Sequence, residues 1–514
     1  MKELEQLLGL FVAAVLLAGA ARRIGAPYPV FLAVGGALLA FLPIGSPFTL
    51  PPELALALFV APVLLDAAYD ASLRDLKDNW LPVSGLVICA VGLTTVAVAA
   101  VVRVLLPEMP WAPAIALGAI VAPPDAVAAT AVLRPLRPPH RILTILEGES
   151  LLNDASSLLI YRLAVGAVAA NSFSIGDAAP AFLLGIAGSA LVGPALGWAM
   201  LQLMDRVRHV PTSIILQFVT TLAVWLLAER LGLSAVLTMV CYAVTVAQTS
   251  PARTPARVRV PTYAVWETVV FALNILAFIF IGLQIRPILD ALEPAERGRY
   301  LLVSVAVVVT VIVVRIAWHM TFNTVIRWQH RRFGFRPPRP MLRPSAASGL
   351  IISWSGMRGI VSLAAALALP LAFPFRDLIV LTAFSVVLGT LVIQGLTLKP
   401  LLRVLDLQDD DPVGREVQAA RERALRAGLE SVPDDGSPVA AAVRQELTSQ
   451  LVAPVSRDGT GEPLSAHGAL HGQAVQAARH EVLTMRANAE IGDDAFHLIE
   501  EELDWLEMSG RANR

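Results

Sequence analysis

Polar side chains interrupt an otherwise apolar stretch, "ILEGESLLNDASSLLIYRL" at residues 145–163. Glu149 and Asn153 are four residues apart, and so are Ser150 and Asp154. Residues four apart lie on the same face of a helix, so a helix here would carry one polar stripe along an apolar rod. The stripe offers carboxylate, hydroxyl and amide oxygens, which are the ligands that hard cations prefer. The pattern predicts a site for a monovalent cation.

The chemistry of such a site would be competition between a cation and a proton. A carboxylate among apolar side chains also binds protons, because burial disfavours its charged form. Asp154 is therefore expected to hold either a cation or a proton, but not both well. If the protein alternates access only when this site is occupied, the competition by itself exchanges cations for protons.

Two predicted breaks in helices would bring backbone oxygens and a second carboxylate to this site. In "IVAPPDAVAAT" a proline pair removes two backbone donors, and Asp125 follows it directly. In "SWSGMRGIVSL" two glycines loosen the backbone around an arginine. Interrupted helices of transporters expose carbonyl groups that coordinate cations. The residues of this predicted crossing are Pro123, Pro124, Gly356, Arg358 and Gly359.

Other ionisable residues also lie deep in apolar runs, where each costs roughly 2.5–3.5 kcal/mol on insertion scales and usually faces a cavity or a partner. Asp66 is a further candidate ligand. Glu149 would compete with the cation site unless a positive charge neutralised it, and Arg315 lies inside the apolar run "VVVTVIVVRIAWHM". We therefore expect a buried ion pair between Glu149 and Arg315. Arg358 is expected to offset helix dipoles where the broken helices cross.

The elements that must position these residues are membrane helices. The chain has 514 residues, of which 56% are hydrophobic and 16% charged, whereas soluble domains are nearer a quarter charged. Apolar runs long enough to span a bilayer recur as far as about residue 404, which excludes a barrel. The net charge of −1, with no basic patch outside the membrane loops, argues against nucleic acid as a partner.

The apolar runs predict an all-α polytopic protein with about 13 transmembrane helices. The predicted spans are roughly 4–21, 27–43, 51–70, 80–106, 112–132, 142–170, 177–204, 211–231, 233–248, 262–285, 299–322, 347–373 and 377–403. Alternate loops carry most of the Arg and Lys residues, so those loops are predicted to be cytoplasmic. The N-terminus is then outside, and the C-terminal end is cytoplasmic.

Thirteen spans divide into two six-helix repeats around one extra helix. The two predicted breaks fall in the fifth span of each repeat, as expected for inverted repeats whose interrupted helices cross at mid-membrane. Residues 1–404 would form the transmembrane exchanger domain. Residues 405–514 are rich in Ala, Glu and Arg and predict a helical cytoplasmic tail, with amphipathic segments at 412–430 and 473–488 and a regulatory role as one interpretation.

Several ordered motifs resemble those of sodium/proton antiporters of the monovalent cation:proton antiporter-1 family, bacterial type. They are "FVAPVLLDAAYDASLRDLKDNW", "VAPPDAVAATAVL", "LEGESLLNDASSLLIYRLA", "VWETVVFALNILAFIFIGLQI", "WSGMRGIVSLAAALALP" and "GTLVIQGLTLKPLL", and they extend over about residues 5–405. The resemblance implies an inverted-repeat fold of thirteen helices. It also implies a homodimer in which a core domain moves against a dimerisation domain.

The same resemblance implies a set of site residues. It assigns the cation and the proton to Asp154, with Asp125, Ser150 and Asp66 as further ligands, and it pairs Glu149 with Arg315. The Asn153–Asp154 pair implies electroneutral one-for-one exchange. Two positions depart from the family pattern, namely Asp66, which is often glutamate, and Pro124, which is often threonine. Both departures bear on whether Na⁺, K⁺ or Li⁺ is preferred.

The leading hypothesis is a secondary antiporter in the plasma membrane, driven by gradients and needing no cofactor, that exchanges Na⁺, with K⁺ and Li⁺ as open alternatives, for H⁺. No phosphate-binding loop for ATP hydrolysis is present in the sequence. The residues leave open a K⁺/H⁺ antiporter and a cation channel or pH sensor of the same fold. An intramembrane hydrolase could use paired aspartates, but no substrate-gating motif supports an enzyme.

Overall fold

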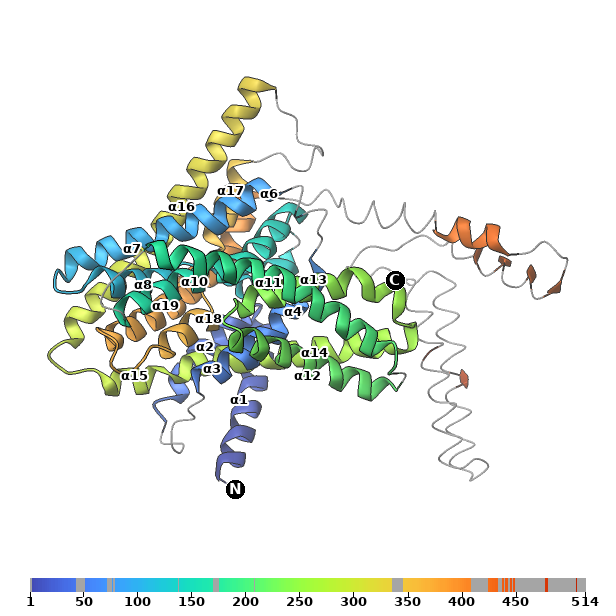
Figure 1. Cartoon of the computed structure of the whole chain (residues 1–514), viewed down its shortest axis with the longest axis horizontal. Coiled ribbons are helices and arrows are strands. Elements are labelled where there is room, and N and C mark those ends of the chain that lie inside the picture. Colours follow the sequence, from blue (N-terminus) through green and yellow to red (C-terminus); the bar gives the residue numbers. More distant parts are fainter. Residues whose placement is uncertain are drawn as a thin grey trace. The chain divides into compact units, whose positions relative to one another are not determined.

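The structure is a computed structural model that describes residues 2–42, 51–71, 76, 79–136, 138–169, 175–207, 209–334, 345–407 and 424–432, and isolated positions after them (Figure 1). The chain divides into two compact units, Met1–Asp410 and Asp411–Arg514. In the second unit residues 424–431 are helical. The rest of the amphipathic segments predicted at 412–430 and 473–488 lies almost wholly outside the described residues.

The first unit is built from helices alone over its described residues. Those before residue 170 are α1 (Lys2–Ile24), α2 (Tyr28–Leu39), α3 (Pro52–Ala55), the π-helical turn η1 (Leu56–Val60), α4 (Ala61–Asp70), α6 (Trp80–Ser84), the π-helical turn η2 (Gly85–Ala90), α7 (Val91–Leu105), α8 (Trp111–Val121), α9 (Ala126–Leu133), the 3-10 turn η3 (Arg134–Leu136) and α10 (His140–Ala169). Those after it are α11 (Ile175–Met204), α12 (Val210–Arg230), α13 (Ala235–Arg253), α14 (Ala256–Leu283), α15 (Ile285–Ala291), α16 (Arg297–Phe333), α17 (Ala346–Trp354), α18 (Ile360–Leu367) and α19 (Arg376–Leu405).

Eight helical stretches of the described chain are long and apolar enough to cross a membrane, and three shorter apolar helices accompany them. A helix needs about 20 apolar residues to span the hydrocarbon core, and only a helix satisfies its own backbone there. The predicted all-helical, multi-pass architecture is confirmed in this form. The count of thirteen spans and the two inverted repeats stay predictions.

Helical structure is interrupted at both places that the sequence singled out. The first break lies within one of these eight stretches, and the second lies between α17 and α18, which are not among them. At the first break, α8 ends at Val121 and α9 begins at Ala126, with the proline pair between them. At the second break, α17 ends at Trp354 and α18 begins at Ile360. Each break leaves backbone groups without helical partners in the interior of the protein, and those groups must be satisfied by other segments.

The buried core holds the broken helices in place. One large apolar cluster joins α8, α10, α16 and α19, and it includes Leu117, Ile145, Val307 and Leu391, each 1% exposed or less. A second cluster joins α4, α12 and α13. Figure 1 shows α10 and α19 running alongside α8 in the same layer of the first unit. Both interruptions therefore lie among tightly packed helices.

Candidate cation site at the crossed helix breaks

The two interrupted helices are joined by a backbone hydrogen bond at their crossing. The N–H of Asp125 donates to the carbonyl oxygen of Met357 over 2.6 Å. Asp125 also caps α9, because its Oδ1 accepts a hydrogen bond of 2.9 Å from the N–H of Val127. Aspartate at this position satisfies an otherwise free donor at a helix start. The Asp125 carboxylate is thus fixed by both broken helices.

Arg358 satisfies the carbonyl groups that the breaks leave free. Its guanidinium is 1% exposed and donates to the carbonyl oxygens of Val121 at 3.0 Å and Ala122 at 3.2 Å, and also to that of Gly356. Its backbone N–H donates to Thr390 Oγ1 at 3.1 Å. A cation at the C-terminal end of α8 offsets the negative end of the helix dipole. The contact is compatible with the dipole role predicted for Arg358 at the crossing, and that role stays a prediction.

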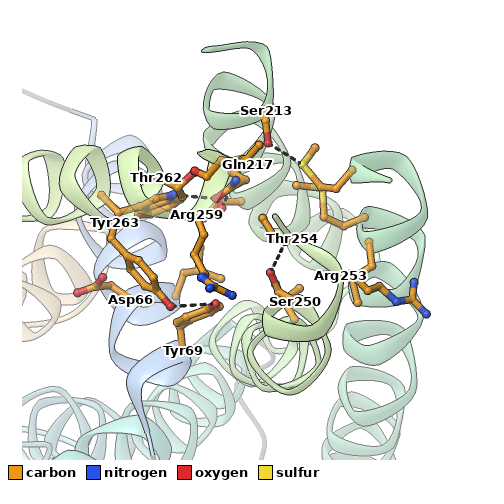
Figure 2. A pocket seen from close by; sticks show the side chains of 18 of the residues that line it. Asp66, Tyr69, Ser213, Gln217, Ser250, Arg253, Thr254, Arg259, Thr262 and Tyr263 are labelled. Carbon is orange, nitrogen blue, oxygen red and sulfur yellow. Dashed lines mark hydrogen bonds between the residues drawn. The ribbon is translucent and has the colours of Figure 1, made fainter. Parts of the chain in front are cut away.

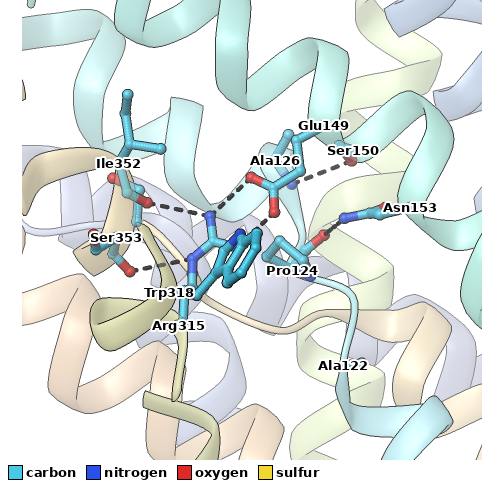
Figure 3. A network of polar contacts seen from close by, with 12 residues as sticks. Ala122, Pro124, Ala126, Glu149, Ser150, Asn153, Arg315, Trp318, Ile352 and Ser353 are labelled. Atoms are coloured by element: carbon cyan, nitrogen blue, oxygen red, sulfur yellow. Dashed lines mark hydrogen bonds and ion pairs between the residues drawn. The ribbon is translucent and has the colours of Figure 1, made fainter. Parts of the chain in front are cut away.

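The polar stripe of α10 lies against the first break. Asn153 Nδ2 donates to the carbonyl oxygen of Pro124 at 3.3 Å, and the N–H of Ala126 donates to Ser150 Oγ at 3.4 Å (Figure 3). Asn153 is fully buried, and its Oδ1 has no hydrogen-bond partner within the described part of the chain. A buried carbonyl oxygen without a partner is costly unless a cation or water supplies one. The amide oxygen of Asn153 is therefore available to bind a cation or a water molecule.

A cavity of about 330 Å³ opens at the crossing. Three predicted acids line it, namely Asp66 from α4, Asp125 from the first break and Asp154 from α10. Ser150, Pro123, Pro124 and Gly359 complete the predicted residues on its wall. The described residues contain no group of three or more Asp, Glu, His or Cys side chains close enough to hold a metal ion together. Asp66 thus shares the cavity with the other two acids without joining them in one tight cluster.

Glu149 is separated from this cavity by an ion pair. Its carboxylate accepts hydrogen bonds of 2.5 and 2.8 Å from the two terminal nitrogens of Arg315, and the two side chains are 1% and 3% exposed (Figure 3). Arg315 also donates to the carbonyl oxygens of Ser353 and Ile352, each at 3.2 Å, at the end of α17. Glu149 is not among the residues that line the cavity. Arg315 neutralises the charge of Glu149, so this acid needs no transported ion as a partner.

Two further polar residues that line the cavity were not singled out from the sequence. Glu267 and Asn274 belong to α14, seven residues apart and hence on one face of the helix, and both line the cavity. The motif "VWETVVFALNILAFIFIGLQI" contains both of them. Their spacing across two helical turns was the available signal, but an acid and an amide seven residues apart are also common on a solvated helix face.

A larger cavity of about 610 Å³ adjoins the first. The two share Asp66, Arg134 and Glu267 as lining residues. Figure 2 shows Asp66, Tyr69 and Tyr263 together on one side of the larger cavity, with Arg259 directed between them and Ser250. Residues of the loops predicted to be cytoplasmic, such as Arg253, line it as well.

The family model described as "Sodium/hydrogen exchanger, transmembrane" matches residues 10–404. An uncharacterised Na⁺/H⁺ exchanger of Mycobacterium tuberculosis is 32% identical over 79% of this chain and 75% of its own length. The sodium, potassium, lithium and rubidium/H⁺ antiporter of Bacillus subtilis is 27% identical over 94% of this chain and 74% of its own length.

A solved structure shares the fold. The sodium proton antiporter MjNhaP1 from Methanocaldococcus jannaschii superimposes with a TM-score of 0.58 at 17% identity, over 79% of this chain and 100% of that one. The matched family consists of transporters rather than enzymes, as predicted. On the extent of the family match, this chain belongs to the transmembrane sodium/hydrogen exchangers.

Proposed function

We propose that the protein exchanges Na⁺ for H⁺ across the plasma membrane, and that the two ions compete for Asp154 and Asp125. The observation that carries the proposal is the division of the buried acids at the crossing. Asp125 and Asp154 line the cavity together with Asp66, while Glu149 lies outside the cavity lining and is paired with Arg315. An acid inside the membrane that has no cationic partner is suited to bind a transported ion.

The proposed ligands of Na⁺ are all oxygens. Asp154 and Asp125 contribute carboxylates and Ser150 a hydroxyl group from the cavity wall. Asn153 is not among the lining residues and contributes an amide oxygen that has no hydrogen-bond partner among the described residues. Pro124 takes part through its carbonyl oxygen, which accepts the amide hydrogen of Asn153 and so directs the amide oxygen. Asp66 would act on the wall of the cavity, where it attracts cations toward the site.

Electroneutral exchange follows if one Na⁺ replaces one H⁺. The two aspartates carry a net charge of about −1 with one proton bound and the same charge with one Na⁺ bound. Either loaded form then moves the same charge, so the membrane potential does no net work on the cycle. The neutral Asn153 beside Asp154 is consistent with this stoichiometry, because a third acid there would call for a second cation.

The range of cations is proposed to extend to K⁺ and Li⁺. The relatives from Bacillus subtilis and Bacillus pumilus are described as antiporters of sodium, potassium, lithium and rubidium with H⁺. Asp66 is a shorter acid than glutamate and leaves more room in the cavity for a larger ion. A K⁺/H⁺ antiporter is accordingly the second candidate, and the same site would serve it.

The remaining features of the proposal concern architecture. The distribution of basic residues supports an N-terminus outside and residues 405–514 in the cytoplasm, where they are proposed to act as a regulatory unit. Two inverted six-helix repeats within residues 1–404 would bring the two breaks together, as observed at the bond between Asp125 and Met357. A homodimer in the lipid bilayer completes the proposal, in which a core domain moves against a dimerisation domain.

Purified full-length protein in proteoliposomes tests the function. With an imposed pH gradient, Na⁺, K⁺ and Li⁺ are added in turn while internal pH and ²²Na⁺ uptake are recorded. Coupled proton and cation fluxes that do not respond to a clamped membrane potential support electroneutral exchange. Proton movement without cations, or a cation current under voltage, would instead identify a channel and overturn the proposal.

A further inference from the structure

The junction of the two cavities carries a positive charge, which is unexpected on the path of a cation. Arg134 lines both cavities, together with the acids Asp66 and Glu267. It stands at the end of α9, the helix that begins at Asp125. Arg134 therefore belongs to the wall that the two cavities share.

Arg134 is held by a weak contact. Its Nη2 lies 3.1 Å from Glu147 Oε1, and the two side chains are 63% and 31% exposed. Exposed ion pairs contribute little to folding, because water screens them and both side chains lose freedom. Glu147 is on α10, two residues before Glu149 and three before Ser150, and it lines the smaller cavity. The pair can therefore open and close without cost to the fold.

We propose that Arg134 is a tethered cation that competes with the transported ion at the entrance of the site, and that Glu147 restrains it. The inference rests on the proposed function and assigns a residue that sets its apparent cation affinity. Arg134 repels an incoming Na⁺ and offers its own charge to Asp66 and Glu267. Glu147 attracts both the guanidinium and the Na⁺ ion, so it weakens the competition of Arg134 with Na⁺ for the acids at the entrance.

The proposal predicts opposite effects for the two members of one ion pair. Arg134→Gln removes the competitor, and the apparent dissociation constant and KM for Na⁺ should fall roughly two- to tenfold. Glu147→Gln releases the guanidinium and removes an attracting charge, so both constants should rise by a similar factor. The double variant and Arg134→Lys should each remain within about twofold of the wild type. A purely structural ion pair would move both single variants in the same direction.

A second ion pair on the larger cavity supplies the matched control. Arg253 Nη1 lies 3.4 Å from Asp205 Oδ2, and both residues line only the larger cavity. Figure 2 shows Arg253 on the opposite side of that cavity from Asp66. Arg253→Gln and Asp205→Asn should change the Na⁺ constants by less than about twofold, because water and salt screen charges so far from the site.

The experiment measures Na⁺ affinity in two ways with full-length protein. Equilibrium ²²Na⁺ binding in detergent gives a dissociation constant, and exchange in proteoliposomes gives KM and the maximal rate. Opposite shifts that shrink on raising choline chloride support the proposal. Equal-sign shifts, or no shift in either single variant, overturn it. Failure of the proposed function is seen separately, as uncoupled flux in the wild type; if the wild type binds no Na⁺ at all, both proposals are wrong.

Discussion

The backbone N–H of Asp125 donates a hydrogen bond to the carbonyl oxygen of Met357 across 2.6 Å, and these residues are far apart in the chain. The bond ties the first broken helix to the second at the point where both have lost their helical pattern. The position of the Asp125 carboxylate therefore depends on the second half of the chain as much as on its own helix. This dependence makes several substitutions informative.

Neutralising the proposed ion seat should stop exchange without unfolding the protein. Asp154→Asn keeps the size and polarity of the side chain but cannot exchange a proton for a cation. We expect coupled flux to fall to the level of protein-free liposomes, and Asp125→Asn to lose nearly as much. Asp290→Asn is the control, because this acid of α15 is paired with Arg286 at 3.7 Å on an exposed surface. Coupled exchange at normal rates in Asp154→Asn would refute the site.

Competition between Na⁺ and H⁺ has a definite sign with pH. Protons that occupy the site must be displaced by Na⁺, so the KM for Na⁺ should rise as pH falls, approaching tenfold per pH unit when the site is mostly protonated. The maximal rate at saturating Na⁺ should change much less. Exchange measured over a matrix of pH and Na⁺ concentration checks this. A constant KM with a falling maximal rate would point to a separate proton switch.

The buried ion pair should matter for stability far more than an exposed one. Glu149→Gln leaves Arg315 charged and buried, which costs about 3–5 kcal/mol. Glu108→Gln removes an equally close contact, 2.6 Å from Arg299, but there the side chains are about half exposed and the loss should be under about 1 kcal/mol. Thermal unfolding of both variants in detergent measures the contrast.

The charge-swapped variant tests whether the attraction between the two charges is sufficient, or whether each charge is needed at its own position. Glu149→Arg with Arg315→Glu restores an ion pair, so it should recover part of the folding or exchange that either single substitution loses. Arg315 also donates to the carbonyl oxygens of Ser353 and Ile352, which a glutamate cannot do. Recovery is therefore expected to be incomplete. If no assay shows any recovery, the attraction between the two charges is not what places them.

Local chemistry was enough to predict part of this site. Proline lacks an N–H and glycine lacks a side chain, so the breaks at residues 123–124 and 356–359 could be anticipated without a fold. Charges are rare in apolar helices, which narrows the partners of Glu149 to very few residues. The structure places it against Arg315, 166 positions away.

The rest depends on packing that no local pattern contains. Arg358 donates to the carbonyl oxygens of Val121 and Ala122, two apolar residues more than 230 positions earlier. Glu267 and Asn274 are ordinary residues of α14 until the cavity on their face is known. The two cavities likewise share the wall that contains Arg134 because of the way α4, α9 and α14 pack together. Such relationships are set by the buried helix contacts and by the crossing of the two breaks.

Gly359 gives the sharpest test of the crossing. A Cβ atom at this position would meet the Asp125 carboxylate, with its Oδ2, Cγ and Cβ as the nearest atoms. The backbone of Gly359 has φ −132° and ψ −156°, an extended conformation that any residue can adopt. Gly359→Ala therefore adds one methyl group against the proposed ligand without straining its own backbone. We expect exchange to fall more than tenfold and unfolding to become easier by about 1–3 kcal/mol.

The control is a glycine with open space around it. A Cβ at Gly166, in α10, would have no atom within 4 Å, so Gly166→Ala should leave exchange unchanged and raise helix stability by up to about 1 kcal/mol. Sodium binding and exchange are measured for both variants beside thermal unfolding. Because Asp125 is held by its own hydrogen bond to Met357, it cannot withdraw freely from the added methyl group. Normal exchange in Gly359→Ala would mean that the carboxylate leaves this position during transport, and that the arrangement at the crossing is not the one that binds the ion.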